Sequence, residues 1–184
     1  LYPNAANPRF GTFVARSLEA LAARGDWRVT LVNPIGLPPL SIGRYRPLVE
    51  LPEQATEGGI TVLRPRFTLI PRIGARRNAA AIARAVLPLV RRLHEHARID
   101  LVDAQFFFPD GPAAAVIAQA LGLPLSIKAR GSDITFWGEV SAARQQMLEA
   151  ARAADGLLAV SRELACRMER LGMDADKIAI HYTG

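Results

Sequence analysis

Residues 123–133 read LPLSIKARGSD, a short apolar strand that runs directly into Arg130, Gly131, Ser132 and Asp133. In an open parallel sheet, the carboxyl ends of the strands meet the amino ends of helices, whose unpaired N–H groups and positive dipole attract phosphates and carboxylates. A glycine between a cationic and an anionic side chain at such a strand end is typical of an α/β enzyme site. We therefore predict that this turn belongs to a functional site.

A second turn of this kind lies near the start of the chain, where residues 2–13 read YPNAANPRFGTF. Gly11 would let the backbone pass close to a ligand, and the start of the following helix would point N–H groups toward that ligand. The same glycine also fits an ordinary turn, and both explanations stay open. The other glycines of a dinucleotide-binding fingerprint are missing, which counts against an NAD site.

Strand and helix patterns alternate along the chain. Apolar spacing predicts helices over 13–24, 76–97, 112–121, 141–154 and 162–171, and strands over 28–33, 60–64, 101–104, 124–129, 156–160 and 177–181. Residues 34–59 read as a surface excursion with at most short structure. The alternation predicts an α/β fold: an open, doubly wound, mostly parallel sheet of the Rossmann-like type, with helices on both faces.

The composition predicts a single globular domain. The chain has 184 residues, 50% of them hydrophobic, which can bury one core, and its single cysteine excludes an internal disulfide framework. We find neither an apolar run of the ~20 residues that span a bilayer nor a charged-then-apolar leader, and we expect a cytoplasmic protein. The net charge of +6 comes from arginine and attracts anionic partners.

Four segments, taken in order, carry a family pattern. They are Asn7–Val14 with Leu18 and Leu21, Asp100–Gln105 with Pro109–Gly111, Arg130–Asp133, and Asp155–Ser161 with Ile178–Gly184. Together they resemble the N-terminal domain of a GT-B glycosyltransferase of the family-four type, whose members transfer sugars from nucleotide donors with retention of configuration. Many members have a histidine where this chain has Arg130, so no role of a neutral imidazole is carried over.

The resemblance implies one half of a two-domain enzyme. Residues 1–184 would be the acceptor-side domain, with its first strand truncated and the C-terminal donor-binding domain absent, and it would be inactive alone. The reaction would move a hexose from a nucleotide-sugar donor to a saccharide or lipid-linked acceptor in bacterial polysaccharide biosynthesis, with no cofactor.

The matched motif also implies roles for individual residues. Arg130 and Asp133 are the expected catalytic residues, with Arg130 binding a phosphate or carboxylated sugar through its planar fork and Asp133 orienting it or a sugar hydroxyl. The expected substrate contacts are Phe10, Gly11, Asp110, Gly111, Gly131 and Ser132. The plainer alternative is an ion pair at a helix start, with Ser132 or Asp133 as the N-cap.

Three other features have structural explanations beside the functional ones. Asp110 could bind an acceptor hydroxyl, but it also fits a helix cap. The rings of residues 106–108 could stack on a sugar or lipid, but they also fit the core. Lys128 lies within a strand, and we expect it either to be structural or to contact the residues that form the site. Asp174 and Asp176 have metal-binding spacing, but they lie between a helix and a strand at the opposite edge of the sheet, so we predict a surface loop and no metal.

A basic series accompanies apolar residues in the middle of the chain. It comprises Arg72, Arg76, Arg77, Arg84, Arg91, Arg92 and Arg98. Such a series fits either peripheral contact with an anionic membrane at the inner face of the cell membrane or a solvated helix face. The alternative functions are a non-catalytic basic module that binds membrane or nucleic acid, and a sugar-nucleotide epimerase domain. Scarce lysine and the lack of a recognised motif argue against nucleic acid.

Overall fold

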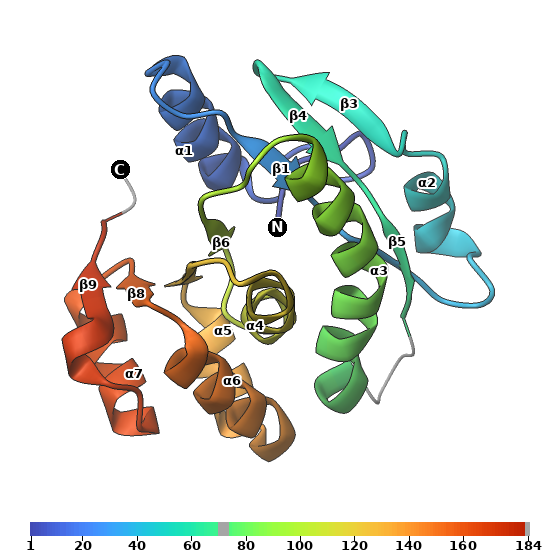
Figure 1. Cartoon of the computed structure of the whole chain (residues 1–184). Helices are drawn as coiled ribbons and strands as arrows, with labels where there is room; N and C mark the ends of the chain where they lie inside the picture. The colour runs from blue at the N-terminus through green and yellow to red at the C-terminus, as the bar shows by residue number, and fades with distance from the viewer. Residues whose placement is uncertain (70–73, 183–184) are drawn as a thin grey trace. The chain divides into compact units, whose positions relative to one another are not determined.

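The computed structural model describes residues 1–69 and 74–182 (Figure 1). The chain divides into two compact units, Leu1–Pro71 and Arg72–Gly184, which we call the first and the second unit and describe separately. No helix among the described residues is both long enough and apolar enough to cross a membrane.

The first unit combines short strands with one regular helix. Its elements are α1 (Thr12–Ala23), β1 (Thr30–Val32), β2 (Ile35–Leu37), the 3-10 helix η1 (Gly43–Tyr45), α2 (Arg46–Val49), β3 (Gln54–Glu57), β4 (Ile60–Leu63) and β5 (Arg66–Thr68). Strand β4 lies between β1, to which it is parallel, and β3, to which it is antiparallel, while β2 and β5 form a separate parallel pair.

A small core holds the first unit together. Val14 and Leu18 lie one helical turn apart on α1, and they join the same buried cluster as Ile60 and Val62, which alternate along β4. The apolar side chains of α1, which have helical spacing, therefore pack with the alternating apolar side chains of β4 in one layer.

The second unit is built around four parallel strands. Its elements are α3 (Gly74–His96), β6 (Val102–Ala104), α4 (Asp110–Leu121), β7 (Leu125–Ala129), α5 (Ser132–Thr135), η2 (Trp137–Glu139), α6 (Ser141–Ala153), β8 (Gly156–Ala159), α7 (Arg162–Leu171), η3 (Ala175–Lys177) and β9 (Ile178–Ile180). The strands lie in the order β6-β7-β8-β9, which is also their order along the chain.

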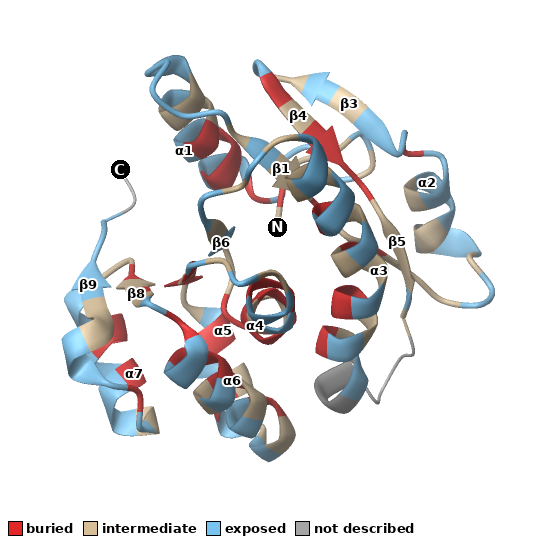
Figure 2. Cartoon of the chain, in the orientation of Figure 1, coloured by how far each residue is buried: buried red, intermediate tan, exposed pale blue. Residues whose placement is uncertain are grey.

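One face of this sheet is apolar and carries the core. Leu125, Ile127 and Ala129 alternate along β7 and join Leu157 and Ala159 of β8 in one buried cluster. Residues of α4, α6 and α7 belong to the same cluster, because right-handed crossovers between strands that follow one another in order place all the connecting helices on the same side. Helix α4 carries more buried positions than α6 or α7 (Figure 2).

The opposite face of the sheet carries polar side chains along β6 and β7. The register pairs Asp103 of β6 with Ser126 of β7, and Lys128 of β7 with Leu158 of β8. Paired residues of parallel neighbours point to the same side, so these side chains share a face that excludes the core residues. We call it the polar face.

The α/β class with a parallel sheet and helices is confirmed, as are the five helices and six strands expected from the sequence, with ends shifted by one or two residues. Residues 34–59 contain only short elements, as expected. The sequence analysis missed β5 and the turn helix α5, whose short sequences RFT and SDIT combine polar and apolar residues and show neither a continuous apolar run nor a helical period.

Candidate functional site

Two loops of the second unit lie at the carboxyl ends of neighbouring strands. Residues 105–109 follow β6, and the turn at Arg130 and Gly131 follows β7. Because β6 and β7 are parallel and paired, both loops emerge at the same edge of the sheet. This edge carries most of the residues that the sequence analysis singled out.

The Asp133 carboxylate joins these two loops. Its oxygens accept hydrogen bonds from the backbone N–H groups of Phe107 at 2.8 Å, Arg130 at 3.0 Å and Gly131 at 2.7 Å. The side chain has no exposed surface. One carboxylate therefore collects three main-chain donors, two from its own turn and one from the loop after the neighbouring strand.

Burial raises the pKa of Asp133 above its ordinary value, and the backbone N–H groups of Phe107, Arg130 and Gly131 work in the opposite direction. With both oxygens occupied by main-chain donors and the side chain enclosed, the carboxylate is placed to hold the backbone. A direct catalytic role for Asp133 stays a prediction.

Arg130 is half-buried and leans on the loop after β6. Its Nε donates to the Gln105 backbone carbonyl at 3.2 Å, and its Nη2 donates to the Gln105 side-chain oxygen. Gln105 in turn donates to the Asp103 carboxylate, which also accepts from the Ser126 hydroxyl. Burial lowers the pKa of Arg130, while Asp103 and Asp133 raise it. The guanidinium is thus positioned by a hydrogen-bonded chain that begins on the polar face.

Lys128 belongs to the same constellation, with a partner that the sequence analysis missed. Its side chain is only 3% exposed, and its Nζ lies 2.6 Å from Nδ1 of His181, just beyond the end of β9. Burial, together with the positive charge of Arg130, lowers the pKa of Lys128 to about 8, although Asp103 acts against this shift. The alternation of Ser126 and Lys128 in the sequence indicated a shared face, but only strand pairing brings His181 there.

The flanking predicted residues take positions that shape these loops. Gly131 has φ of 140°, a backbone conformation that L side chains rarely adopt, and its N–H donates to Asp133 within this turn. A Cβ on Gly111 would lie 3.0 Å from Cγ2 of Ile127, so this glycine lets α4 approach β7 closely. Ser132 is exposed at the start of α5.

Asp110 is the first residue of α4 and is partly buried. Burial raises the pKa of Asp110, and the nearby Asp133 carboxylate raises it further. The three phenylalanines before Asp110 differ in burial. Phe107 and Phe108 are buried in the core, which agrees with the structural explanation, whereas Phe106 is only partly buried.

Phe10 and Gly11 lie in the first unit. The Phe10 side chain is 57% exposed, and Gly11 precedes α1 with φ of 74°. A Cβ on Gly11 would lie 2.9 Å from main-chain atoms of Leu1 and Tyr2, so this glycine permits a close approach of two backbone segments. The structural explanation for Gly11 therefore has direct support, and its contact with a substrate stays a prediction.

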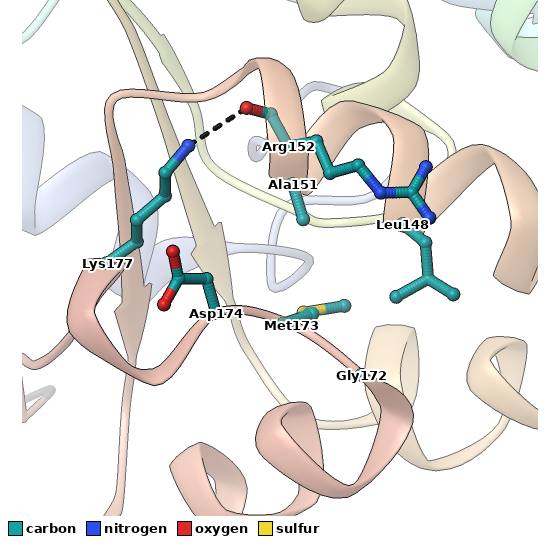
Figure 3. A pocket seen from close by; sticks show the side chains of 7 residues that line it. All are labelled: Leu148, Ala151, Arg152, Gly172, Met173, Asp174 and Lys177. Atoms are coloured by element: carbon teal, nitrogen blue, oxygen red, sulfur yellow. Dashed lines mark hydrogen bonds between the residues drawn. The ribbon is translucent and has the colours of Figure 1, made fainter.

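A hollow of about 320 Å³ lies at the other edge of the second unit (Figure 3). It is lined by Leu148, Ala151, Arg152, Gly172, Met173, Asp174 and Lys177. Lys177 donates to the carbonyls of Arg152 at 2.9 Å and Ala154 at 2.8 Å, which closes the carboxyl end of α6. Asp174 accepts from the Asp176 N–H, and both are exposed, which confirms the predicted surface loop. The hollow is a structural junction at the amino ends of the strands.

The basic series is exposed along α3 where the structure describes it. Arg77, Arg84 and Arg91 are exposed and recur every seven residues, so they form one stripe, with Arg92 beside it. Arg72 lies outside the described residues.

Comparison with known proteins identifies the family to which the chain belongs. The family model described as Glycosyltransferase Family 4 matches residues 10–184. The chain is 28% identical to TuaC of Bacillus subtilis (strain 168), whose name refers to a glycosyltransferase of teichuronic acid biosynthesis. That match covers 98% of this chain and 47% of TuaC, so the chain spans about half the length of this curated relative.

Solved structures share the fold. Anabaena Alr3699/HepE in complex with UDP is 19% identical, with a TM-score of 0.57 over 100% of this chain and 42% of that chain. Its complex with UDP-glucose is 15% identical, with a TM-score of 0.57 over 100% of this chain and 41% of that chain. At these identities the likeness concerns the fold alone, and it confirms the GT-B assignment.

The Asp133 clamp can be tested by removing its charge. We expect Asp133→Asn to lower the free energy of unfolding by about 2–4 kcal/mol, because an amide group would turn N–H donors toward buried backbone donors. Urea denaturation followed by circular dichroism measures the change. Asp174→Asn is the matched control, since Asp174 also accepts a backbone N–H but is exposed, and it should change stability by less than about 0.5 kcal/mol. Equal losses in the two variants would contradict the clamp.

The buried ammonium of Lys128 makes stability depend on pH. The folded pKa of about 8 lies below the ordinary 10.5, so at pH 7 folding carries a cost of about 3 kcal/mol that disappears as the pH rises through this window. We expect Lys128→Met to be more stable than the parent at pH 7, with an advantage that shrinks between pH 8 and 10.5. Urea titrations of both proteins at several pH values measure it. An advantage that did not vary with pH would refute this electrostatic explanation.

Proposed function

Because the chain belongs to glycosyltransferase family 4, we propose that it supplies the acceptor half of the cleft of a retaining transferase. The reaction moves a hexose from a nucleotide-sugar donor to a saccharide or lipid-linked acceptor. The observation that carries this proposal is the clamped pair of loops: within the matched span, Asp133 fixes the turn that presents the Arg130 guanidinium at the carboxyl edge of the sheet. We propose that the chain is inactive without the remainder of the enzyme.

The proposed chemistry rests on separating charge. As the bond to the leaving group breaks, positive charge develops on the sugar and negative charge on the departing diphosphate, so cations and N–H donors near that diphosphate lower the barrier. Arg130 fits this role because its guanidinium stays charged and offers donors in a planar fork. In the proposed mechanism the acceptor attacks from the face that the leaving group departs from.

The arrangement of Asp133 supports a mechanism without a covalent intermediate at this carboxylate. A nucleophile needs an oxygen free to reach the sugar, and both Asp133 oxygens accept main-chain hydrogen bonds in an enclosed position. We therefore assign Asp133 a positioning role. Asp110 is proposed to bind an acceptor hydroxyl, and Phe10, Gly11, Gly111, Gly131 and Ser132 are proposed to shape or contact the substrate path.

The activity test uses the longest natural polypeptide that contains this sequence, and it measures release of nucleoside diphosphate from a panel of sugar donors. We expect Arg130→Ala to lower kcat/KM by about 100-fold or more, the usual effect of removing one charge-stabilising donor. Arg130→Lys keeps the charge but loses the planar fork, so its kcat/KM should lie between those of Arg130→Ala and the unsubstituted protein.

The matched control is Arg152→Ala, an exposed arginine at the opposite edge of the sheet. It should change kcat/KM by less than about 2-fold. Full activity of Arg130→Ala with intact folding would rule out the proposed role of Arg130. Absence of transfer with every donor and acceptor would count against the proposed transferase activity. Salt-sensitive binding to DNA or RNA would favour the alternative function, a non-catalytic basic module.

We also propose that the α3 stripe lets the protein lie on an anionic membrane. Each arginine near such a surface contributes about 1 kcal/mol, so Arg84→Ala with Arg91→Ala should weaken binding to phosphatidylglycerol vesicles by roughly 30-fold at low salt. Vesicle co-sedimentation measures this, with pure phosphatidylcholine vesicles as the uncharged reference. The matched control is Arg162→Ala with Arg167→Ala, two exposed arginines of α7. An equal loss in both double variants would point to general charge, and not to the stripe.

A further inference from the structure

We propose that the exposed side of α5, together with the residues just after it, binds a hexopyranose ring. Its members are Ser132, Thr135, Phe136 and Glu139, all of which are exposed, and we call this surface the sugar platform. Their spacing of three and four residues places them on one side of a helical turn. The Thr135 N–H donates to the Gly131 carbonyl at 2.8 Å, so the sugar platform continues directly from the turn that Asp133 closes.

The Phe136 ring is open to solvent and is supported from one side. The side chain is 61% exposed, and its ring meets that of Trp137 in a T-shaped contact, with centroids 5.1 Å apart and planes at 81°. The Trp137 ring in turn lies 5.0 Å from that of Phe108, which is 1% exposed. Aromatic pairs of this geometry stabilise by more than the area that they bury. A ring that a ligand can reach is therefore held against the core through Trp137.

The backbone under the sugar platform is held as well. Asp133, Ile134 and Gly138, which lie between the exposed positions, are buried. A Cβ on Gly138 would lie 2.8 Å from Cδ1 of Leu171, so this glycine lets η2 approach α7 closely. Groups that are already in place lose little conformational freedom when a ligand binds, which favours affinity.

A hexopyranose has the complementary chemistry. The C–H bonds on one face of the sugar carry partial positive charge and match the negative face of an aromatic ring, while hydroxyl groups extend from the edge of the sugar. Around the Phe136 ring, the hydroxyls of Ser132 and Thr135 can donate or accept, and the Glu139 carboxylate accepts. Glu139 takes part in none of the ion pairs of the described residues. An apolar surface with a few polar groups at its border is typical of a small-molecule site.

The same composition argues against a membrane or a protein partner. Between Ile117 and Ala179, a span that the structure describes completely, Phe136 is the one exposed large apolar side chain. Membranes and protein partners cover contiguous apolar patches, whereas one ring matches one sugar. The negative charge of Glu139 also disfavours an anionic lipid surface and the phosphates of a nucleotide.

The origin of the sugar rests on the proposed function. Since the chain is proposed to supply the acceptor half of the cleft, we assign the ring to the acceptor, and the donor sugar is the other source. Saccharide binding is measured without a donor and without turnover. A failure of the sugar platform and a failure of the proposed transferase activity are therefore separate results.

The first experiment measures saccharide binding by saturation-transfer NMR with the longest natural polypeptide that contains this sequence. The probes are the methyl glycosides of glucose, galactose, N-acetylglucosamine and glucuronic acid. We expect saturation of the aromatic protons of the protein to reach the ring C–H groups of at least one probe. Phe136→Ala and Phe136→Leu should each weaken binding by about 10-fold, because neither keeps an aromatic face, and Phe136→Trp should retain binding.

The matched control is Trp27→Ala, which removes an aromatic side chain of similar exposure, 46%, between α1 and β1 of the first unit. It should leave saccharide binding unchanged. Circular dichroism verifies the folding of each variant, and Glu139→Gln, which should weaken binding by several-fold, tests the sugar platform without touching the ring. Equal binding by Phe136→Leu and the unsubstituted protein, an equal loss in Trp27→Ala, or no binding of any probe would overturn the proposal.

Kinetics then identify the source of the sugar. We expect Phe136→Leu to raise the KM for the acceptor by about 10-fold and to change kcat by less than about 2-fold, because the ring binds sugar and does not meet the reacting atoms. A rise in the acceptor KM alone assigns the ring to the acceptor, and a rise in the donor KM alone assigns it to the donor sugar. Both results support the sugar platform, whereas a loss of kcat with both KM values unchanged would contradict it.

Discussion

The hydrogen bonds of the Asp133 carboxylate are the constraint on which the candidate site depends. Parallel strands leave their carboxyl-end loops without partners in the sheet, and a buried carboxylate that accepts three backbone N–H groups supplies those partners. The loop after β6 is thereby tied to the turn after β7. Arg130 then lies close enough to Gln105 for its guanidinium to donate to both the backbone carbonyl and the side-chain oxygen of that residue.

The residues of the Arg-Gly-Ser-Asp turn at positions 130–133 contribute to the candidate site in different ways. Its two charged side chains make different contacts. Gly131 provides the backbone conformation that turns the chain, and Asp133 closes it from within. Arg130 instead donates to Gln105 in the loop after β6. One charged side chain of this turn therefore contacts the neighbouring loop, and the other holds the main chain.

Lys128 illustrates the conflict between stability and function. An apolar residue would fill its place in β7 at lower cost, because a shielded ammonium lacks the hydration that water would give it. Proteins accept such costs mostly at sites that bind or react.

The sequence by itself determined the succession of helices and strands in the second unit, since the helices are long enough to show an apolar period and the strands between them are apolar runs. It also indicated the turn at residues 130–133 and its family. The short strands β2, β3 and β5 were not placed by it, because they lie among prolines, glycines and charged residues that show no clear apolar run. It also named Arg130 and Asp133 as site residues, but it did not predict the backbone groups that Asp133 holds, because a sequence does not show which carboxylate oxygens accept from which N–H groups. Only the tertiary structure brought Gln105 to Arg130 and His181 to Lys128. Contacts between residues that are 25 and 53 positions apart arise from strand pairing, and pairing is a property of the folded sheet.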